Sequence, residues 1–283
     1  MNNEFRDRSD VVRAAIRKAG RSVALWIGLG IFALGLLHAQ KPFKEYPSIE
    51  HTGYHLPADW DRPAEWVFAR LKYPDIERFY RSDSVYWTMD YPAGDRHIVD
   101  ALRRLTRIDA RSVEQVVELD GSDDVYNWPF LYAVEVGYWD PTTDEAQQLR
   151  DYLDRGGFLM VDDFHGPPEW ENFKYVMSLV FPDRDIRDLA PNHTIFHVMA
   201  DVDQLVQVPA AQYIISGETW EKGGRIPHWR GIVDDKGRVV VAIDHNMDLG
   251  DSVEWADDPR YPEEFAAIGF RIFTNYVTYD LTH

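Results

Sequence analysis

The stretch Asp151–Gly166, which reads DYLDRGGFLMVDDFHG, places the strictest limit on how this chain can fold. Residues 151–154 end a segment whose apolar residues have the spacing of an amphipathic helix. Gly156-Gly157 follows, where glycine accepts the positive φ that often ends a helix. Phe158–Val161 is then an apolar run too short for a helix, as expected for a strand buried on both faces. The stretch therefore predicts a helix, a tight turn and a central strand of a parallel sheet.

The same alternation of strand and helix patterns covers most of the chain. We predict strands at residues 65–73, 113–119, 131–136 and 158–161, helices that begin near residues 94, 142, 167 and 265, and a β-hairpin over residues 230–243. Strands and helices that alternate with short connections are typical of a doubly wound parallel sheet. We therefore expect one α/β domain at residues 65–283, in which helices cover both faces of a mainly parallel sheet.

Three local patterns give sharper expectations. Asp95 is a suitable N-cap for the first helix of the domain, whose inner face would carry Leu105. Thr142 and Glu145 fit the Thr-x-x-Glu capping box, so another helix is predicted to begin there. Residues 244–258 are mostly polar and are predicted to form a long loop.

The first 40 residues have the composition of an export segment. Basic residues precede the uncharged run Val23–Leu37. This run is shorter than the ~20 apolar residues of a membrane-spanning helix and has the length of a signal-peptide core. We expect a cleaved signal peptide or an uncleaved membrane anchor at residues 1–40 and a linker at residues 41–64. The domain would then face the periplasm or the exterior.

Charge and cysteine content exclude several classes of function. The net charge of −18 argues against nucleic-acid binding, which needs lysine and arginine to neutralise phosphates, and against adsorption to an anionic membrane surface. The chain contains no cysteine, so disulfides, a cysteine nucleophile and thiolate metal sites are excluded.

Polar residues at the end of the strand at residues 158–161 form the first candidate site. Ligands bind outside the C-terminal ends of the strands in open α/β sheets, which favours Asp162, Asp163 and His165 as ligand contacts. They would act as metal ligands or as an acid–base pair. The alternative is that one aspartate caps the following helix and the other pairs with an arginine. Side chains alternate along a strand, so Asp162 and Asp163 should not point the same way.

A second candidate group opens the hairpin. His228, Trp229 and Arg230 combine a titratable ring, an indole face and a guanidinium, which suit a sugar or a carboxylate. In the alternative interpretation, Trp229 packs beneath the hairpin and Arg230 pairs with one of the many acids.

A third group follows the second hairpin strand, in the sequence HNMDLGD. His245, Asn246, Asp248 and Asp251 resemble a loop that binds a hard cation through oxygens, although Asx turns explain the pattern equally well. Asp163, His165, His245 and Asp248 together make the candidate ligand set for a divalent metal.

A fourth group decorates the polar stretch at residues 74–97. Long loops inside compact domains are usually functional, so Asp83, Asp95, Arg96 and His97 are candidate residues at the rim of the pocket. The alternative is a purely structural role.

Several long segments of the chain match a known family, and they are residues 82–97, 101–108, 125–140, 152–166, 227–231, 239–262 and 274–283. On these segments the chain resembles the bacterial domain of unknown function 4159 family. The middle segment is also similar to the class I glutamine amidotransferase-like fold and its ThuA-like branch, a flavodoxin-like three-layer sandwich in which a sharp elbow after a strand presents the functional residue. In the amidotransferases that residue is a nucleophilic cysteine, so the resemblance implies the fold without glutaminase activity.

Three functions remain open. The first is an envelope domain that binds a small polar or sugar-like ligand at the strand ends. The second is a metal-assisted hydrolase of glycan or peptide substrates, in which a bound water is the nucleophile. The third, implied by proteins that often accompany relatives of this kind, is a partner in an envelope assembly associated with a MoxR-type ATPase.

Overall fold

The computed structural model describes residues 40–283 except residue 52 and residues 77–84. The export segment predicted at residues 1–40 therefore lies almost wholly outside the described residues. Within the described part, no helix is both long enough and apolar enough to span a membrane. The compact unit begins at Phe43, so most of the segment that we expected to be a linker packs on the domain.

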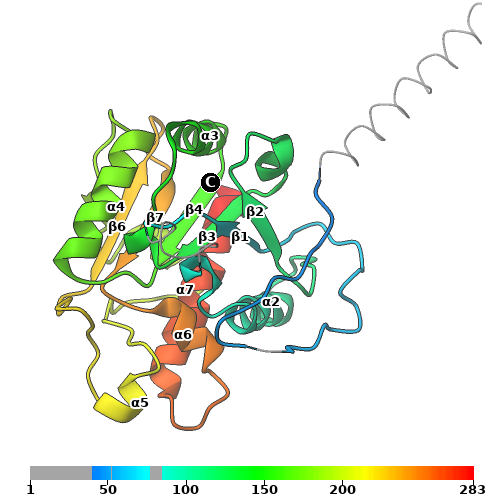
Figure 1. Ribbon diagram of the computed structural model, residues 1–283. Helices are drawn as coiled ribbons and strands as arrows, with labels where there is room; N and C mark the ends of the chain where they lie inside the picture. The colour runs from blue at the N-terminus through cyan, green and yellow to red at the C-terminus, as the bar shows by residue number, and fades with distance from the viewer. Residues whose placement is uncertain (1–39, 52, 77–84) are drawn as a thin grey trace, which may run out of the picture. The chain divides into compact units, whose positions relative to one another are not determined.

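A seven-stranded sheet forms the centre of this unit (Figure 1). Its strands are β1 (Ala69–Lys72), β2 (Gln115–Glu118), β3 (Phe130–Val134), β4 (Phe158–Asp162), β5 (Arg187–Asp188), β6 (His228–Val233) and β7 (Val239–His245), in the spatial order β2-β1-β3-β4-β7-β6-β5. The first five strands in that order run parallel, and β6 and β5 extend the sheet in antiparallel fashion. The prediction of a mainly parallel sheet is confirmed.

Helices cover both faces of the sheet, which gives the three-layer arrangement that the alternating pattern predicted. The helices are α2 (Ala93–Leu105), α3 (Thr143–Asp154), α4 (Gly166–Val180), α5 (Tyr213–Ser216), α6 (Leu249–Glu254) and α7 (Glu263–Thr282), with short 3-10 helices at residues 86–88, 123–127, 136–138 and 194–196. One face packs against α3 and α4, and the opposite face packs against α2, α6 and α7.

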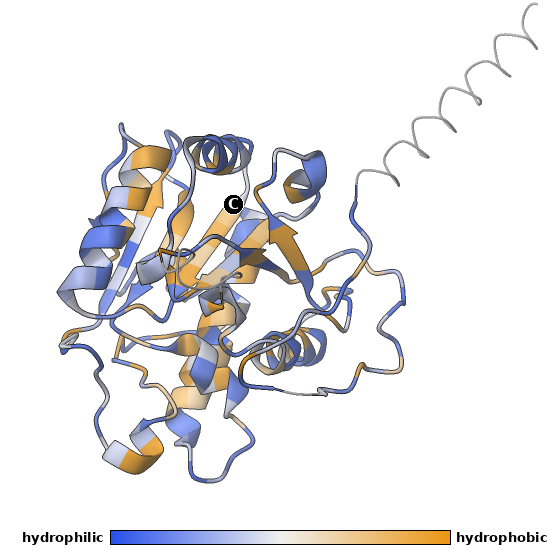
Figure 2. Cartoon of the chain, viewed as in Figure 1, coloured by the Kyte–Doolittle hydropathy of each residue, from blue (hydrophilic) through white to orange (hydrophobic). Residues whose placement is uncertain are grey.

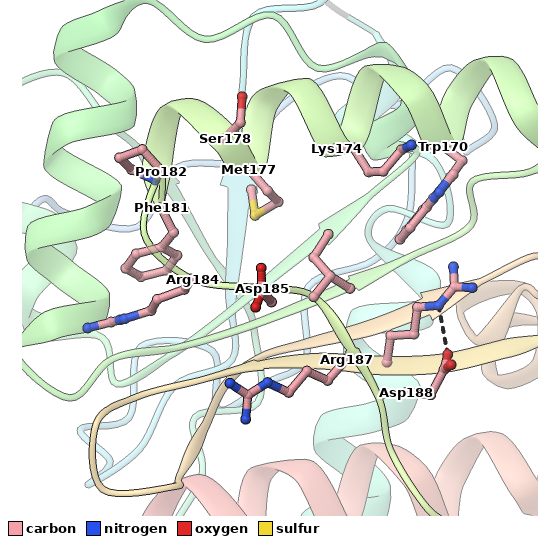
Figure 3. Close-up of a pocket in the computed structure, with 12 residues that line it drawn as sticks. Trp170, Lys174, Met177, Ser178, Phe181, Pro182, Arg184, Asp185, Arg187 and Asp188 are labelled. Carbon is pink, nitrogen blue, oxygen red and sulfur yellow. Dashed lines mark hydrogen bonds and ion pairs between the residues drawn. The ribbon is translucent and has the colours of Figure 1, made fainter.

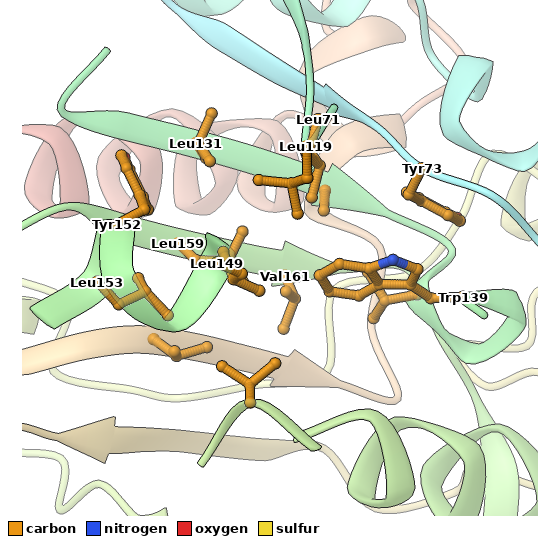
Figure 4. Close-up of a cluster of buried hydrophobic side chains, with 14 of the residues drawn as sticks. Leu71, Tyr73, Leu119, Leu131, Trp139, Leu149, Tyr152, Leu153, Leu159 and Val161 are labelled. Carbon is orange, nitrogen blue, oxygen red and sulfur yellow. The ribbon is translucent and has the colours of Figure 1, made fainter. Parts of the chain in front are cut away.

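Alternation along the strands divides the core into two clusters. Leu131, Leu159 and Val161 point towards α3, where they meet Leu149 and Leu153 (Figure 4). The intervening strand residues point to the α7 side. Figure 2 shows the central strands as the most hydrophobic part of the fold, whereas α2 and α3 carry polar outer faces. The short strand at residues 158–161 is thus buried on both faces, as predicted.

Local predictions had mixed outcomes. The capping box is present, since Thr142 accepts a hydrogen bond from Glu145 N–H while the Glu145 carboxylate accepts one from Thr142 N–H. Asp95 is not an N-cap, because α2 begins two residues earlier and Asp95 points inward. Leu105 is 56% exposed, since it lies in the last turn of α2, beyond the edge of the core. The predicted loop at residues 244–258 contains the end of β7 and all of α6.

Candidate functional site

Five polar residues with left-handed backbone conformations mark the C-terminal edge of the parallel strands. Glu135 directly follows β3 with φ 51°, Asp163 follows β4 with φ 52°, and Asn246 follows β7 with φ 65°. Asp90 (φ 60°) and Lys222 (φ 46°) complete the set, which holds every described non-glycine residue with positive φ. Such conformations cost free energy and concentrate at functional sites. The strain therefore points to this edge of the sheet.

Asp163 and His165 form a hydrogen-bonded pair at this edge. His165 Nε2 lies 3.0 Å from Asp163 Oδ1, and the backbone N–H of His165 donates to Glu169 Oε2 at 2.6 Å. Burial lowers the pKa of His165 to about 3, so the imidazole is neutral near pH 7. Burial also raises the pKa of Asp163 well above its usual value. His165 Nδ1 has no hydrogen-bond partner among the described residues, so this nitrogen can still donate or accept a bond.

Lys222 supplies positive charge to the same edge. Its Nζ lies 2.8 Å from Glu169 Oε1 and 3.4 Å from Glu135 Oε2. Burial raises the pKa of Glu135 to about 8, although Lys222 opposes that shift. The Lys222 carbonyl also packs on the start of α4, where a Cβ at Gly166 would lie only 2.1 Å from its oxygen. The segment around Lys222 therefore sits over the ends of β3 and β4.

Asp162 has a different and structural role. Its Oδ2 accepts hydrogen bonds from the N–H groups of Leu249 and Gly250, both at 2.8 Å, and from the Tyr132 hydroxyl at 3.3 Å. Burial raises its pKa to about 7. Asp162 thus joins β4 to the N-terminus of α6 and points away from Asp163, as alternation predicted. One aspartate does cap a helix, but that helix is α6 and not the following α4.

The other histidines extend the site towards α4. The rings of His228 and His245 are stacked with centroids 5.6 Å apart, and the centroid of His245 lies 4.8 Å from that of Trp170. Burial lowers the pKa of His245 to about 3. Asn246 does not face this stack; its side chain accepts from Gly166 N–H at 2.8 Å and donates to the Ile226 carbonyl at 2.7 Å. The structure therefore makes Asn246 a cross-link between three segments.

Arg230 lines a surface groove, whereas Trp229 does not. Trp229 is buried beneath the hairpin, edge-on to Phe196, as its alternative interpretation predicted. Arg230 faces a groove of about 750 Å³ between α4 and β5, with its guanidinium carbon 4.4 Å from the Trp170 ring centre and its Nε 2.9 Å from Asp188 Oδ1. Trp170 and Asp188 both line this groove (Figure 3). Trp170 of α4 thus takes the place beside Arg230 that was expected for Trp229.

The candidate rim residues hold α2 in place instead. Asp95 accepts three hydrogen bonds from Arg70, and both side chains are fully buried. Arg96 pairs with Glu114, with Nε 3.2 Å from Oε2, and His97 Nδ1 lies 2.8 Å from the Val253 carbonyl oxygen. Asp83 lies outside the described residues. Arg70 lies between the apolar residues Ala69 and Leu71 of β1, and this was the available signal that a buried acid must face it.

The predicted metal set does not form a single cluster. Among the described residues, Asp163, His165, His245 and Asp248 do not make a group of three ligand atoms that lie within 4.8 Å of one another. Two other sets of three carboxylates do meet that distance. One set is Glu50, Asp90 and Glu254, and the other is Asp90, Asp248 and Asp251. Sequence reasoning found Asp248 and Asp251 but missed Asp90, because nothing in its local sequence indicates that it folds against α6.

The fold and this edge define an α/β domain whose strand ends carry a concentration of buried carboxylates and imidazoles. The chain belongs to the family described as Domain of unknown function (DUF4159), whose model matches residues 67–281. No curated protein matches the sequence.

Proposed function

We propose that this domain binds a small polar, sugar-like ligand at the C-terminal edge of the sheet, through Asp163, His165 and Lys222. The observation that carries the proposal is the gathering of the left-handed polar residues around the Asp163–His165 pair. The proposal includes an extracytoplasmic location, on the basis of residues 1–40. It also includes an amidotransferase-like fold without glutaminase activity, since the chain has no cysteine.

The exposure of the three side chains supports this choice. The Asp163 side chain is 12% exposed and that of Lys222 is 36% exposed, whereas the His165 side chain is 1% exposed. A ligand can therefore reach one carboxylate and one ammonium, with the imidazole held behind them. Hydroxyl groups both donate and accept hydrogen bonds, so a polyhydroxylated molecule can bond to the carboxyl and to the ammonium at once.

The Asp163–His165 geometry favours hydrolysis as a second candidate function. The Asp163 carboxyl, whose pKa burial raises, can protonate the leaving oxygen of a glycosidic bond while water attacks the anomeric carbon, and it then takes a proton back from the attacking water. His165, which is hydrogen-bonded to Asp163, would hold that carboxyl in position. Release of product from a model glycoside or peptide, lost in His165→Gln, would distinguish hydrolysis from binding alone.

Thermal shift measurements with a panel of monosaccharides, amino sugars and sugar acids test the binding proposal. We expect at least one of these to raise the unfolding temperature of the natural protein. The shift should disappear in Asp163→Asn, which replaces a carboxyl oxygen by an amide, and in Lys222→Met, which removes the ammonium. Asparagine tolerates the left-handed backbone at residue 163, so the fold should be preserved.

Matched controls lie on the exposed turn between β6 and β7. Asp235→Asn and Lys236→Met make the same chemical changes in exposed side chains of that turn and should keep the full shift. Equal loss in the control variants, or no shift with any compound of the panel, would contradict the proposal.

A further inference from the structure

We propose that Asp90, Asp248 and Asp251 form a binding site for a divalent cation of the oxygen-preferring class, distinct from the Asp163–Lys222 site. A carboxylate oxygen from each of the three residues lies within 4.8 Å of the other two. The three come from two segments far apart in sequence, the connection that precedes α2 and the first turn of α6. The fold itself therefore brings them together.

The two aspartates of α6 are held in fixed positions. Asp248 is the N-cap of α6, and its Oδ1 accepts a hydrogen bond from Asp251 N–H at 2.7 Å. Asp251 Oδ2 accepts a hydrogen bond from Ala211 N–H, also at 2.7 Å. Each carboxylate uses one oxygen for these bonds, which leaves its second oxygen for a ligand. The site is thus organised before any ion arrives.

Asp90 provides an independent indication that something is bound here. Its side chain is 3% exposed, and its Oδ2 has no hydrogen-bond partner among the described residues. That oxygen points at the first turn of α6, because a Cβ built on Gly250 would lie 2.1 Å from it. A buried carboxylate oxygen without a partner is costly, so it calls for a cation or a proton.

The neighbouring cations are already engaged. Arg70 donates to Asp95 and to the carbonyls of Trp87 and Met89. The imidazole of His51 contacts Glu254, which belongs to the other group of three carboxylates. No described lysine or arginine forms an ion pair with any of the three aspartates. Their negative charge therefore lacks a compensating partner.

The other set of three carboxylates, Glu50, Asp90 and Glu254, is a weaker position for the ion. Glu50 Oε2 already accepts a hydrogen bond from Asp90 N–H at 2.7 Å, and Glu254 already contacts His51. We therefore place the ion between Asp90, Asp248 and Asp251. Three carboxylates and no imidazole favour Mg²⁺, Ca²⁺ or Mn²⁺ over zinc or copper.

Titration calorimetry on the chelator-treated full chain tests the site, with MgCl2, CaCl2 and MnCl2 as separate titrants. We expect one of these ions to bind with a stoichiometry of one per chain and to raise the unfolding temperature. Asp90→Asn and Asp248→Asn should each weaken binding by at least about tenfold. Both substitutions preserve side-chain shape, and an asparagine in place of Asp248 would still cap α6.

Asp244→Asn is the matched control. Asp244 is also a buried aspartate with one oxygen, Oδ2, that lacks a hydrogen-bond partner among the described residues. Its Oδ1 accepts from the Tyr276 hydroxyl at 2.9 Å, and Asp244 belongs to neither group of three carboxylates. This variant should bind the ion like the natural protein. If Asp90→Asn does not fold, Asp251→Asn tests the same site from α6.

Two results would overturn the proposal. One is the absence of any heat of binding and any thermal shift with all three ions at millimolar concentration. The other is binding that persists unchanged in Asp90→Asn, Asp248→Asn and Asp251→Asn, since the ion would then lie elsewhere. Neither result affects the Asp163–Lys222 proposal, whose panel contains no metal ion.

Discussion

The buried carboxylates dominate the behaviour of individual residues in this protein. Asp95 has Arg70 as an ion-pair partner, whereas Asp162 accepts hydrogen bonds only from uncharged groups, and Asp90 Oδ2 accepts none. A carboxylate that is buried without a cation keeps its proton to a higher pH than one in water. The folded protein should therefore respond to pH through these groups.

Asp162 gives the sharpest prediction about pH. Its pKa is raised to about 7 by burial, whereas the unfolded chain should show an ordinary aspartate pKa. Because the folded state holds the proton more tightly, this group stabilises the fold at low pH, and its contribution is lost as pH rises from about 4 through 7. The shift corresponds to roughly 4 kcal/mol across that range.

We expect Asp162→Asn to remove this pH dependence. Urea unfolding with chelator present should show that the variant gains stability relative to the natural protein between pH 5 and pH 8. Other titrating groups, including His165 and His245, are common to both proteins and cancel in the difference. Parallel stability curves over this range would show that Asp162 does not titrate as described.

The sequence predicted which residues lie at the site better than it predicted where their side chains point. The sequence indicated that acids and imidazoles follow the strands, and the structure brings Asp163, His165, His228 and His245 to one edge in two pairs. No local pattern indicated that Asp162 would turn to α6 or that Trp170 would replace Trp229 beside Arg230. Those outcomes depend on contacts between segments far apart in sequence.

At the scale of elements, hydrophobic periodicity predicted the strands and the long helices well. It failed at α6, whose six residues Leu249–Glu254 lie in a polar stretch. That helix depends on caps more than on its own pattern, because Asp248 and Asp162 accept hydrogen bonds from its first N–H groups. A short helix held by a distant strand leaves no periodic signal in the sequence.

The capping box of α3 allows a direct measurement of an element that the sequence did predict. Thr142→Ala removes the oxygen that accepts the Glu145 N–H at 3.2 Å, so we expect a loss of about 1 kcal/mol in the free energy of unfolding. Thr142→Ser keeps the oxygen and should lose much less. The midpoint of urea unfolding measures both, and equal losses would mean that the cap contributes little.

At the scale of the whole molecule, the segment before β1 is part of the folded unit. Tyr46 packs edge-on against Trp87 with ring centroids 5.4 Å apart, and its N–H donates to the Tyr91 hydroxyl at 3.2 Å. Glu45 pairs with Arg96 at 3.1 Å, and Glu50 binds Asp90 N–H. We predicted a linker here from the proline and charge content of the segment. The contacts that fix it are long-range, and sequence alone does not reveal them.

Removing this segment should therefore weaken the domain. We expect a chain that starts at Glu65 to unfold at a lower temperature and to be cleaved faster by protease than a chain that starts at Phe43. The chain from Phe43 should match the full-length protein, since the compact unit begins there. Equal unfolding temperatures for the chains from Phe43 and Glu65 would show that these contacts add no stability.

The last strand of the sheet has a consequence for how copies of this protein meet in solution. β5 contributes only Arg187 and Asp188, both exposed and of opposite charge. Open strand edges expose unsatisfied backbone groups that can recruit another chain and nucleate fibrils. An edge strand of two charged residues offers an incoming strand very few backbone groups for pairing. We therefore expect this edge of the sheet to resist edge-to-edge association even when the protein is concentrated.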